Sequence, residues 1–135
     1  MTLHGLGIDV VEVARIAAAI ERYGEAFLAR IFTAAERDYC SGQHAPAQHF
    51  AARFAAKEAA VKALGTGIGE HAGWLDLEIR RSPAGAPELL LHGAAAEFAK
   101  RHGIAEVRIS LTHTKDYAAA NAIALGLSPA GPPAA

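Results

Sequence analysis

Four charged residues lie in the stretch Phe50–Gly67 (FAARFAAKEAAVKALGTG), where nearly all their neighbours are alanine or larger apolar residues. At about 100° per residue in a helix, Arg53 and Lys57 fall at one edge of the bulky apolar stripe, and Glu58 and Lys62 fall at the other. A helix that is apolar all round is buried on both sides. Buried charges are costly unless they are paired or bound to an ion or ligand, so this helix is the first candidate for a functional site.

Asp9 is a second carboxylate with an apolar setting, near the end of the segment LHGLGIDVVEV. Together with Glu58 it suits Mg²⁺, which proteins usually hold through one or two carboxylates while substrate phosphates supply further oxygens. Two simpler interpretations remain open. Asp9 with Glu12 has the spacing of a helix capping box, and Glu58 with Lys62 has the spacing of a surface ion pair. Spacing alone does not decide whether Asp9 meets Glu58.

The remaining polar motifs carry less information. The loop Gly65–Gly69 (GTGIG) lacks the Lys-Ser/Thr ending of a phosphate loop and follows a helix, whose C-terminus repels phosphate. Any phosphate there needs Lys57, Lys62 or a metal to hold it. In Ser110–Thr114 (SLTHT), strand alternation separates the three hydroxyls from His113. No catalytic triad and no zinc-ligand spacing is present, and Cys40 has no partner cysteine.

The expected elements place these residues in an α+β fold, with a mainly antiparallel sheet packed on a long central helix. Strands are predicted at 3–13, 74–80, 88–91, 107–111 and 117–125. Helices are predicted at 12–23, from the capping box Thr33–Glu36 onward, at 46–64 and at 94–101. Pro46 suits the first turn of the central helix, and Gly65 suits its C-cap. Gly5 and Gly7 would allow the first strand to approach another backbone closely.

Composition narrows the class of protein. The 135 residues suffice for one domain, which we expect at 1–127, with a disordered Pro/Ala-rich tail at 128–135. A net charge of -1 gives no electrostatic argument for nucleic acid binding. No run of apolar residues is long enough to cross a membrane, and the lone cysteine suits a reducing cytoplasm.

Several segments, in order, resemble the holo-acyl-carrier-protein synthases, the short type of 4′-phosphopantetheinyl transferase. The matching pieces are Gly5–Glu12 (GLGIDVVE), Arg15-Ile16, Arg30–Thr33 with Glu36, Phe50–Gly67, and Ser110–Thr114 with Tyr117-Ala118. The last of these resembles the family's Ser-x-Ser-His-Ser segment with threonines in place of two serines, which keeps the hydroxyls. The likeness covers roughly residues 5 to 125, and several motifs in order are far more specific than one.

The resemblance implies a role for each matching residue. Asp9 and Glu58 correspond to the magnesium-binding carboxylates, and Lys62 to the second lysine of the family's Lys-Glu-x-x-x-Lys motif. Arg53, Gly65, Ser110 and His113 fall in segments that contact coenzyme A, and Lys57 and Lys62 are further candidates to bind it. Arg15 matches a position that docks the acidic carrier protein. The resemblance also implies a homotrimer with active sites between subunits.

The resulting hypothesis is Mg²⁺-dependent transfer of 4′-phosphopantetheine from coenzyme A to a serine of apo acyl carrier protein, releasing adenosine 3′,5′-bisphosphate. Glu58 and Lys62 would be catalytic; either Glu58 or a metal-bound water would accept the serine proton. Two other classes compete with it. One is a module that binds coenzyme A or a carrier protein without transfer, and the other is a different Mg²⁺-dependent phosphate enzyme such as a nucleotide hydrolase. The sequence does not identify which carrier protein is served.

Overall fold

The computed structural model describes residues 1–127, which form the α+β fold expected from the sequence. The elements are β1 (Thr2–Glu12), α1 (Val13–Tyr23), α2 (Glu25–Ile31), α3 (Ala34–Ser41), α4 (Pro46–Leu64), a 3₁₀ turn η1 (Trp74–Asp76), β2 (Leu77–Arg81), β3 (Pro87–Leu91), α5 (Gly93–Arg101), β4 (Ile104–His113) and β5 (Tyr117–Gly126). The tail predicted to be disordered, 128–135, lies outside the described residues.

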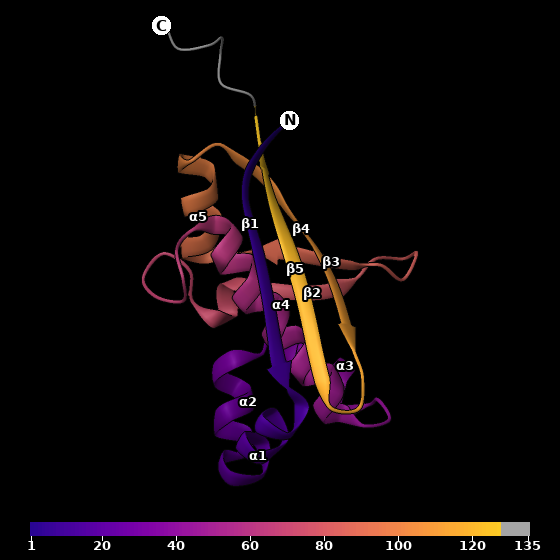
Figure 1. The fold of residues 1–135 in the computed structure, drawn as a ribbon. Helices are drawn as coiled ribbons and strands as arrows, with labels where there is room; N and C mark the ends of the chain where they lie inside the picture. The colour runs from indigo at the N-terminus through magenta and orange to yellow at the C-terminus, as the bar shows by residue number, and fades with distance from the viewer. Residues whose placement is uncertain (128–135) are drawn as a thin grey trace, which may run out of the picture.

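Two antiparallel sheets surround the central helix. The larger sheet has the strand order β1-β5-β4, and the smaller is the hairpin β2-β3. Figure 1 shows the three long strands running side by side along α4, with α1 and α2 gathered at the end of the sheet where β1 finishes. Helix α4 contacts all three strands of the larger sheet, and also α1, α3 and β2. It is therefore covered on both sides, as the sequence predicted.

Alanine side chains let α4 fit between these layers. Ala51, Ala52, Ala55, Ala56, Ala59 and Ala60 are all 0% exposed. The helix begins at Pro46, whose fixed φ and missing N–H suit the first turn. It ends at Gly65, where φ is 82°, a left-handed conformation that glycine adopts without a Cβ penalty. Both predicted boundaries of this helix are confirmed.

Two glycines bring β1 into direct contact with the backbone of α4. A Cβ added to Gly5 would lie 2.0 Å from the carbonyl oxygen of Ala63, and one added to Gly7 would lie 1.8 Å from that of Ala59. Asp9 follows in the same alternating row and so faces α4 as well. The close backbone approach expected at these glycines is confirmed, and it places the Asp9 carboxylate beside the helix.

The other face of β1 is apolar and open. Leu6, Ile8 and Val10 are 64%, 67% and 61% exposed. Across the sheet the same face continues through Ile123 of β5, which is 37% exposed, to the exposed hydroxyl of Ser110 on β4. An exposed apolar patch of contiguous residues on a sheet usually marks an interaction surface.

Three local predictions differ from the structure. The strand expected from Trp74 begins only at Leu77, because the Asp76 carboxylate accepts a hydrogen bond from Gly73 N–H at 2.9 Å and closes a 3₁₀ turn. Helix α2 was not predicted; it follows directly after the Gly24 stop. Strand β4 is longer than expected at both ends, from 104 to 113.

Candidate active site

Asp9 and Lys62 meet on the side of α4 that faces β1. The Lys62 ammonium donates to the backbone carbonyl of Ile8 at 2.9 Å and lies 3.4 Å from the Asp9 carboxylate. Their side chains are 52% and 20% exposed, respectively, so this pair lies at the surface with the carboxylate partly sheltered. The contact joins residues 53 positions apart in the sequence, and it depends on the β1–α4 packing described above.

Glu58 belongs to the same group of charges. Partial burial raises the pKa of the Glu58 carboxyl above its ordinary value of 4.5, and the neighbouring Asp9 carboxylate raises it further. The positive charges of Lys62 and Arg15 partly offset this rise. Asp9, Glu58, Lys62 and Arg15 are therefore close enough to interact electrostatically, and the two carboxylates repel each other.

Neither simpler interpretation of these carboxylates describes the structure. Asp9 lies within β1, while the N-cap of α1 is Glu12, which makes no side-chain capping bond. Within residues 1–127, Lys62 forms its ion pair with Asp9 and not with Glu58. Glu58 is thus a half-buried carboxylate beside a second carboxylate, an arrangement that a bound cation would stabilise.

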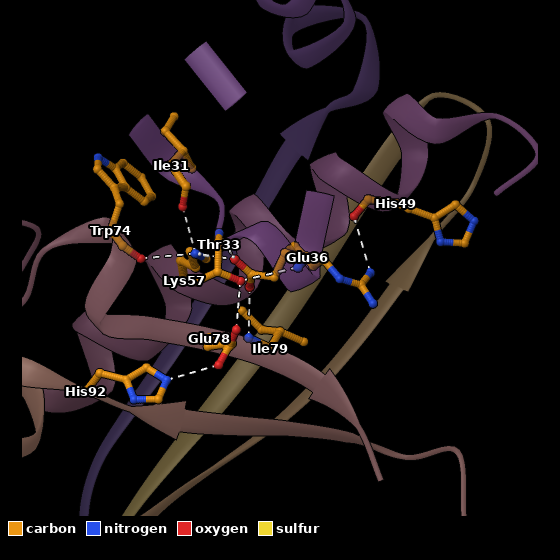
Figure 2. Close-up of polar contacts among 10 residues, drawn as sticks. Ile31, Thr33, Glu36, His49, Lys57, Trp74, Glu78, Ile79 and His92 are labelled. Carbon is orange, nitrogen blue, oxygen red and sulfur yellow. Dashed lines mark hydrogen bonds and ion pairs between the residues drawn. The ribbon is translucent and has the colours of Figure 1, made fainter. Parts of the chain in front are cut away.

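Lys57 projects from a different side of α4, away from this group. Its ammonium is 0% exposed and donates to Ile31 O at 2.7 Å, Glu36 Oε1 at 2.7 Å and Trp74 O at 3.0 Å (Figure 2). All of its N–H groups are therefore occupied within the chain. The helical wheel correctly separated Lys57 from Glu58 and Lys62, but the structure does not bring Lys57 to the surface where a ligand would contact it.

Arg53 is also buried, at 4% exposed, and lies among other cationic and aromatic groups. Its guanidinium lies 4.3 Å from the centre of the Tyr39 ring, and Arg81 lies 5.6 Å from the same ring. The His49 and His113 rings are 4.8 Å apart. Burial lowers the pKa of His49, and the positive charges of His113, Arg53 and Arg81 lower it further.

Arg53, Arg81, His49 and His113 form a cluster of basic side chains around Tyr39, and one of its nitrogens has no partner within the described residues. The Nε atom of Arg53 is buried without a hydrogen-bond partner within residues 1–127. Within the part of the chain that the structure describes, its other guanidinium nitrogens make one hydrogen bond, from Nη1 to His49 O at 3.5 Å. His113 contacts Gln48 through Nδ1 at 3.1 Å. A phosphate group would suit the arginines of this cluster, because guanidinium groups bind phosphate through charge-assisted hydrogen bonds.

The last two predicted site residues lie elsewhere on the surface. Gly65 forms the C-cap of α4, one turn beyond the Lys62 position. Ser110 lies on the exposed face of β4, opposite Asn121 of β5. Ile109, Leu111 and His113 are less exposed than Ser110 and Thr112, which confirms the predicted strand alternation.

Two residues, Glu36 and Arg81, make contacts that the sequence did not predict. Glu36 was predicted as part of a capping box, which is confirmed, but it is also the carboxylate partner of Lys57. Arg81 joins the cationic cluster by donating a hydrogen bond to the Tyr39 hydroxyl at 2.9 Å.

Cys40 is 0% exposed, and burial raises the pKa of its thiol to about 11. A thiol in this setting is not a nucleophile.

Comparison with known proteins identifies the family. A sequence model of the 4′-phosphopantetheinyl transferase superfamily matches residues 5–122. A holo-[acyl-carrier-protein] synthase of Koribacter versatilis is 49% identical over 119 residues, covering 88% of this chain and 95% of the relative. The corresponding protein of Anaeromyxobacter dehalogenans is 52% identical over 128 residues, covering 93% and 98%.

Solved structures agree with the sequence comparison. The holo-[acyl-carrier-protein] synthase of Neisseria meningitidis superposes with a TM-score of 0.86 at 32% identity, covering 92% of this chain and 99% of that one. The Helicobacter pylori enzyme, solved in complex with coenzyme A, gives 0.79 at 32% identity, covering 89% and 99%. The chain therefore belongs to the 4′-phosphopantetheinyl transferase superfamily, and within it to the holo-[acyl-carrier-protein] synthase type of enzyme.

Proposed function

We propose that this enzyme transfers 4′-phosphopantetheine from coenzyme A to a serine hydroxyl of an apo acyl carrier protein in a Mg²⁺-dependent reaction. The products would be the holo carrier protein and adenosine 3′,5′-bisphosphate. The observation that carries the proposal is the group formed by Asp9, Glu58 and Lys62 on one side of α4. The relatives' names and the coenzyme A complex of the Helicobacter pylori enzyme support the choice of substrates.

The donor set fits Mg²⁺ bound together with a substrate. Within residues 1–127 no group of three or more acidic, histidine or cysteine side chains could hold a metal by itself. Mg²⁺ does not need one, because it retains waters and takes oxygens from substrate phosphates in addition to one or two carboxylates. Asp9 and Glu58 would hold the ion, which would neutralise charge on the pyrophosphate of coenzyme A.

The chain's own side chains have separate roles in the transfer. The serine oxygen would attack the phosphorus that carries pantetheine, and the bond from that phosphorus to the adenosine bisphosphate would break. Lys62, already directed toward Asp9, would offset the negative charge on the departing phosphate. Glu58, a half-buried carboxylate of this group, would be the candidate to accept the serine proton.

The cationic cluster around Tyr39 supports a further part of the proposal. Arg53 and His113 would contact phosphate groups of coenzyme A, with Gly65 and Ser110 lining its path. The guanidinium groups of Arg53 and Arg81, which both lie over the Tyr39 ring, support this role through their positive charge. Lys57 is left out of this set, because its donors already bind Glu36 and two backbone carbonyls.

Assembly and partner docking complete the proposed function. The exposed apolar face carried by Leu6, Ile8 and Val10 fits a second copy of the chain and supports a homotrimer with active sites between subunits. Arg15 is exposed on α1 and interacts with Glu58, which suits docking of an acidic carrier protein at the site. Within the described residues no helix could span a membrane, and the single cysteine suits a cytoplasmic location.

Intact-mass spectrometry of a carrier protein tests the proposal. An apo acyl carrier protein is incubated with the enzyme, coenzyme A and Mg²⁺, and a parallel sample contains EDTA. The expected result is a mass gain of one phosphopantetheine arm that is lost with EDTA and restored by excess Mg²⁺. Coenzyme A binding without any mass gain would overturn transfer in favour of a binding module. Turnover of nucleoside triphosphates without use of coenzyme A would favour a different phosphate enzyme.

A further inference from the structure

The interior side of α4 contains a buried ion pair that the proposed reaction does not use. Lys57 and Glu36 are 2.7 Å apart, and both side chains are 0% exposed. Every N–H of the ammonium has an acceptor. The Glu36 carboxylate accepts further bonds from Thr33 N and from Ile79 N, each at 2.8 Å. Figure 2 shows these groups converging on the pair from separate segments.

The partners of the pair come from four different elements around α4. Ile31 ends α2, Thr33 and Glu36 begin α3, Trp74 begins the 3₁₀ turn, and Ile79 lies in β2. The network reaches further outward, because Thr33 Oγ1 donates to Glu78, and Glu78 in turn contacts His92 at 3.0 Å. The pair therefore attaches one point of α4 to four neighbouring elements of the scaffold.

This attachment matters because the many alanines of α4 leave the rotation of the helix about its axis weakly specified. Eight of the 19 residues of α4 are alanine, and apolar residues are buried on every side of the helix, so burial of apolar area distinguishes only weakly between small rotations about its axis. A buried polar pair does specify one arrangement, because any other rotation leaves charges unpaired in the interior. Glu58 follows Lys57 directly and therefore projects about 100° further round the helix, on the side of Asp9.

We propose that the Lys57–Glu36 pair is a positioning element that sets the rotation of α4 and so places Glu58 against Asp9. The inference rests on the proposed function, since it assigns the pair to the same carboxylate site. Lys57 and Glu36 act through the helix and touch neither substrate nor metal.

Three variants and one control test the positioning role. The variants are Lys57→Met, Glu36→Gln and the double variant Glu36→Gln/Lys57→Met. The control is Val107→Ala, which removes packing from a buried position in β4 without touching the pair. Each protein is characterised by its melting temperature, by kcat and KM for coenzyme A, and by its affinity for Mn²⁺ measured by electron paramagnetic resonance with coenzyme A present.

Positioning predicts a specific pattern of results. Misplacement of a reacting group costs about 100-fold in rate, so kcat should fall by about that factor in all three variants while KM for coenzyme A stays nearly constant. Mn²⁺ affinity should weaken by about tenfold, as it does when residues that orient metal ligands are changed. The single variants should melt at a lower temperature. The double variant should recover in melting temperature, because it leaves no unpaired buried charge, but not in kcat.

Other outcomes would overturn the proposal. Recovery of kcat together with melting temperature in the double variant would show a purely structural pair, as would an equal loss of kcat in Val107→Ala. A rise in KM for coenzyme A with kcat unchanged would make Lys57 a direct ligand. If Lys57→Met does not fold, Glu36→Gln and the double variant still distinguish a positioning role from a purely structural one. Absence of transfer by the unmodified enzyme would overturn the proposed function, and the Mn²⁺ affinities would still test positioning.

Discussion

A lysine meets a carboxylate on each of two sides of α4, but the two groups differ in burial and in hydrogen bonding. On the interior side, Lys57 and Glu36 are fully buried and their hydrogen-bonding groups are occupied. On the β1 side, Lys62 is half exposed, and Glu58 lies beside a carboxylate of like charge. A satisfied charge stabilises one arrangement of the chain, whereas an unsatisfied one is available to a ligand. Substitutions on the interior side should therefore act through the placement of the helix, whereas substitutions on the β1 side should act on the site itself.

The largest effect should come from removing the carboxylate charge of Glu58. In Glu58→Gln, kcat should fall by at least about 100-fold, the usual loss when a group that stabilises the transition state is removed. The fold should be kept. Holo carrier protein formation measured by mass spectrometry, with circular dichroism of the variant, checks both. Glu97→Gln on the exposed face of α5 makes the same chemical change away from the site and should be fully active. A fully active Glu58→Gln would exclude the metal role.

Gly7→Ala should disturb the packing of β1 against α4. The new Cβ would lie 1.8 Å from Ala59 O, so the strand must move away from α4 and take Asp9 with it. Overpacking of this kind costs about 1–3 kcal/mol, and kcat should fall as well. Chemical denaturation and the transfer assay measure the two effects. Gly69→Ala meets no atom within 4 Å and should leave the free energy of unfolding nearly unchanged. Equal stability of both variants would contradict the close-contact argument.

Arg15→Glu should separate partner docking from coenzyme A binding. An exposed charge at a docking surface acts mainly on association with the charged partner, so KM for the carrier protein should rise about tenfold, equivalent to about 1.4 kcal/mol. KM for coenzyme A should stay the same. Arg22→Glu reverses a charge on the same helix and should have the smaller effect. If both Michaelis constants rise together in Arg15→Glu, Arg15 belongs to the coenzyme A site instead.

The smallest effect concerns stability against pH. The folded-state pKa of Glu58 is raised, so the folded state binds a proton more readily than the unfolded one, and ionised Glu58 destabilises the fold. This destabilisation develops as pH rises from the ordinary glutamate pKa of 4.5 through the raised folded-state pKa. Glu58→Gln should therefore melt at a higher temperature than the unmodified enzyme at pH 7.5, and the difference should vanish below pH 4. A constant difference across that range would contradict the assignment.

Local features of the fold were predictable from the sequence because their causes are local. Pro46 and Gly65 set the ends of α4 by their own backbone preferences, and Thr33 with Glu36 forms the expected capping box. Helical spacing also separated Lys57 from Glu58 correctly. The alternation of Trp74–Arg80 correctly indicated a strand but placed its start too early, because the bond from Gly73 N–H to Asp76 forms a turn over Trp74–Asp76.

The site was predictable only in part, because it depends on contacts between distant segments. The family resemblance indicated Asp9, Glu58 and Lys62 as site residues. The approach of Asp9 to α4, however, depends on how β1 packs against the helix. The partner of Lys57 lies 21 residues away, and no spacing rule relates the two. The sequence placed Lys57 among the phosphate-binding candidates for that reason, since a lysine in an apolar helix indicates a need for an anion without indicating which one.

The burial of Cys40 has a practical consequence for studying this enzyme in solution. It is the single cysteine of the chain, it is inaccessible, and its thiol remains protonated at neutral pH. Maleimide and methanethiosulfonate reagents require an accessible thiolate. A cysteine introduced at any exposed position would therefore be the one that reacts, so fluorophores or spin labels can be attached at chosen positions without first replacing the native residue.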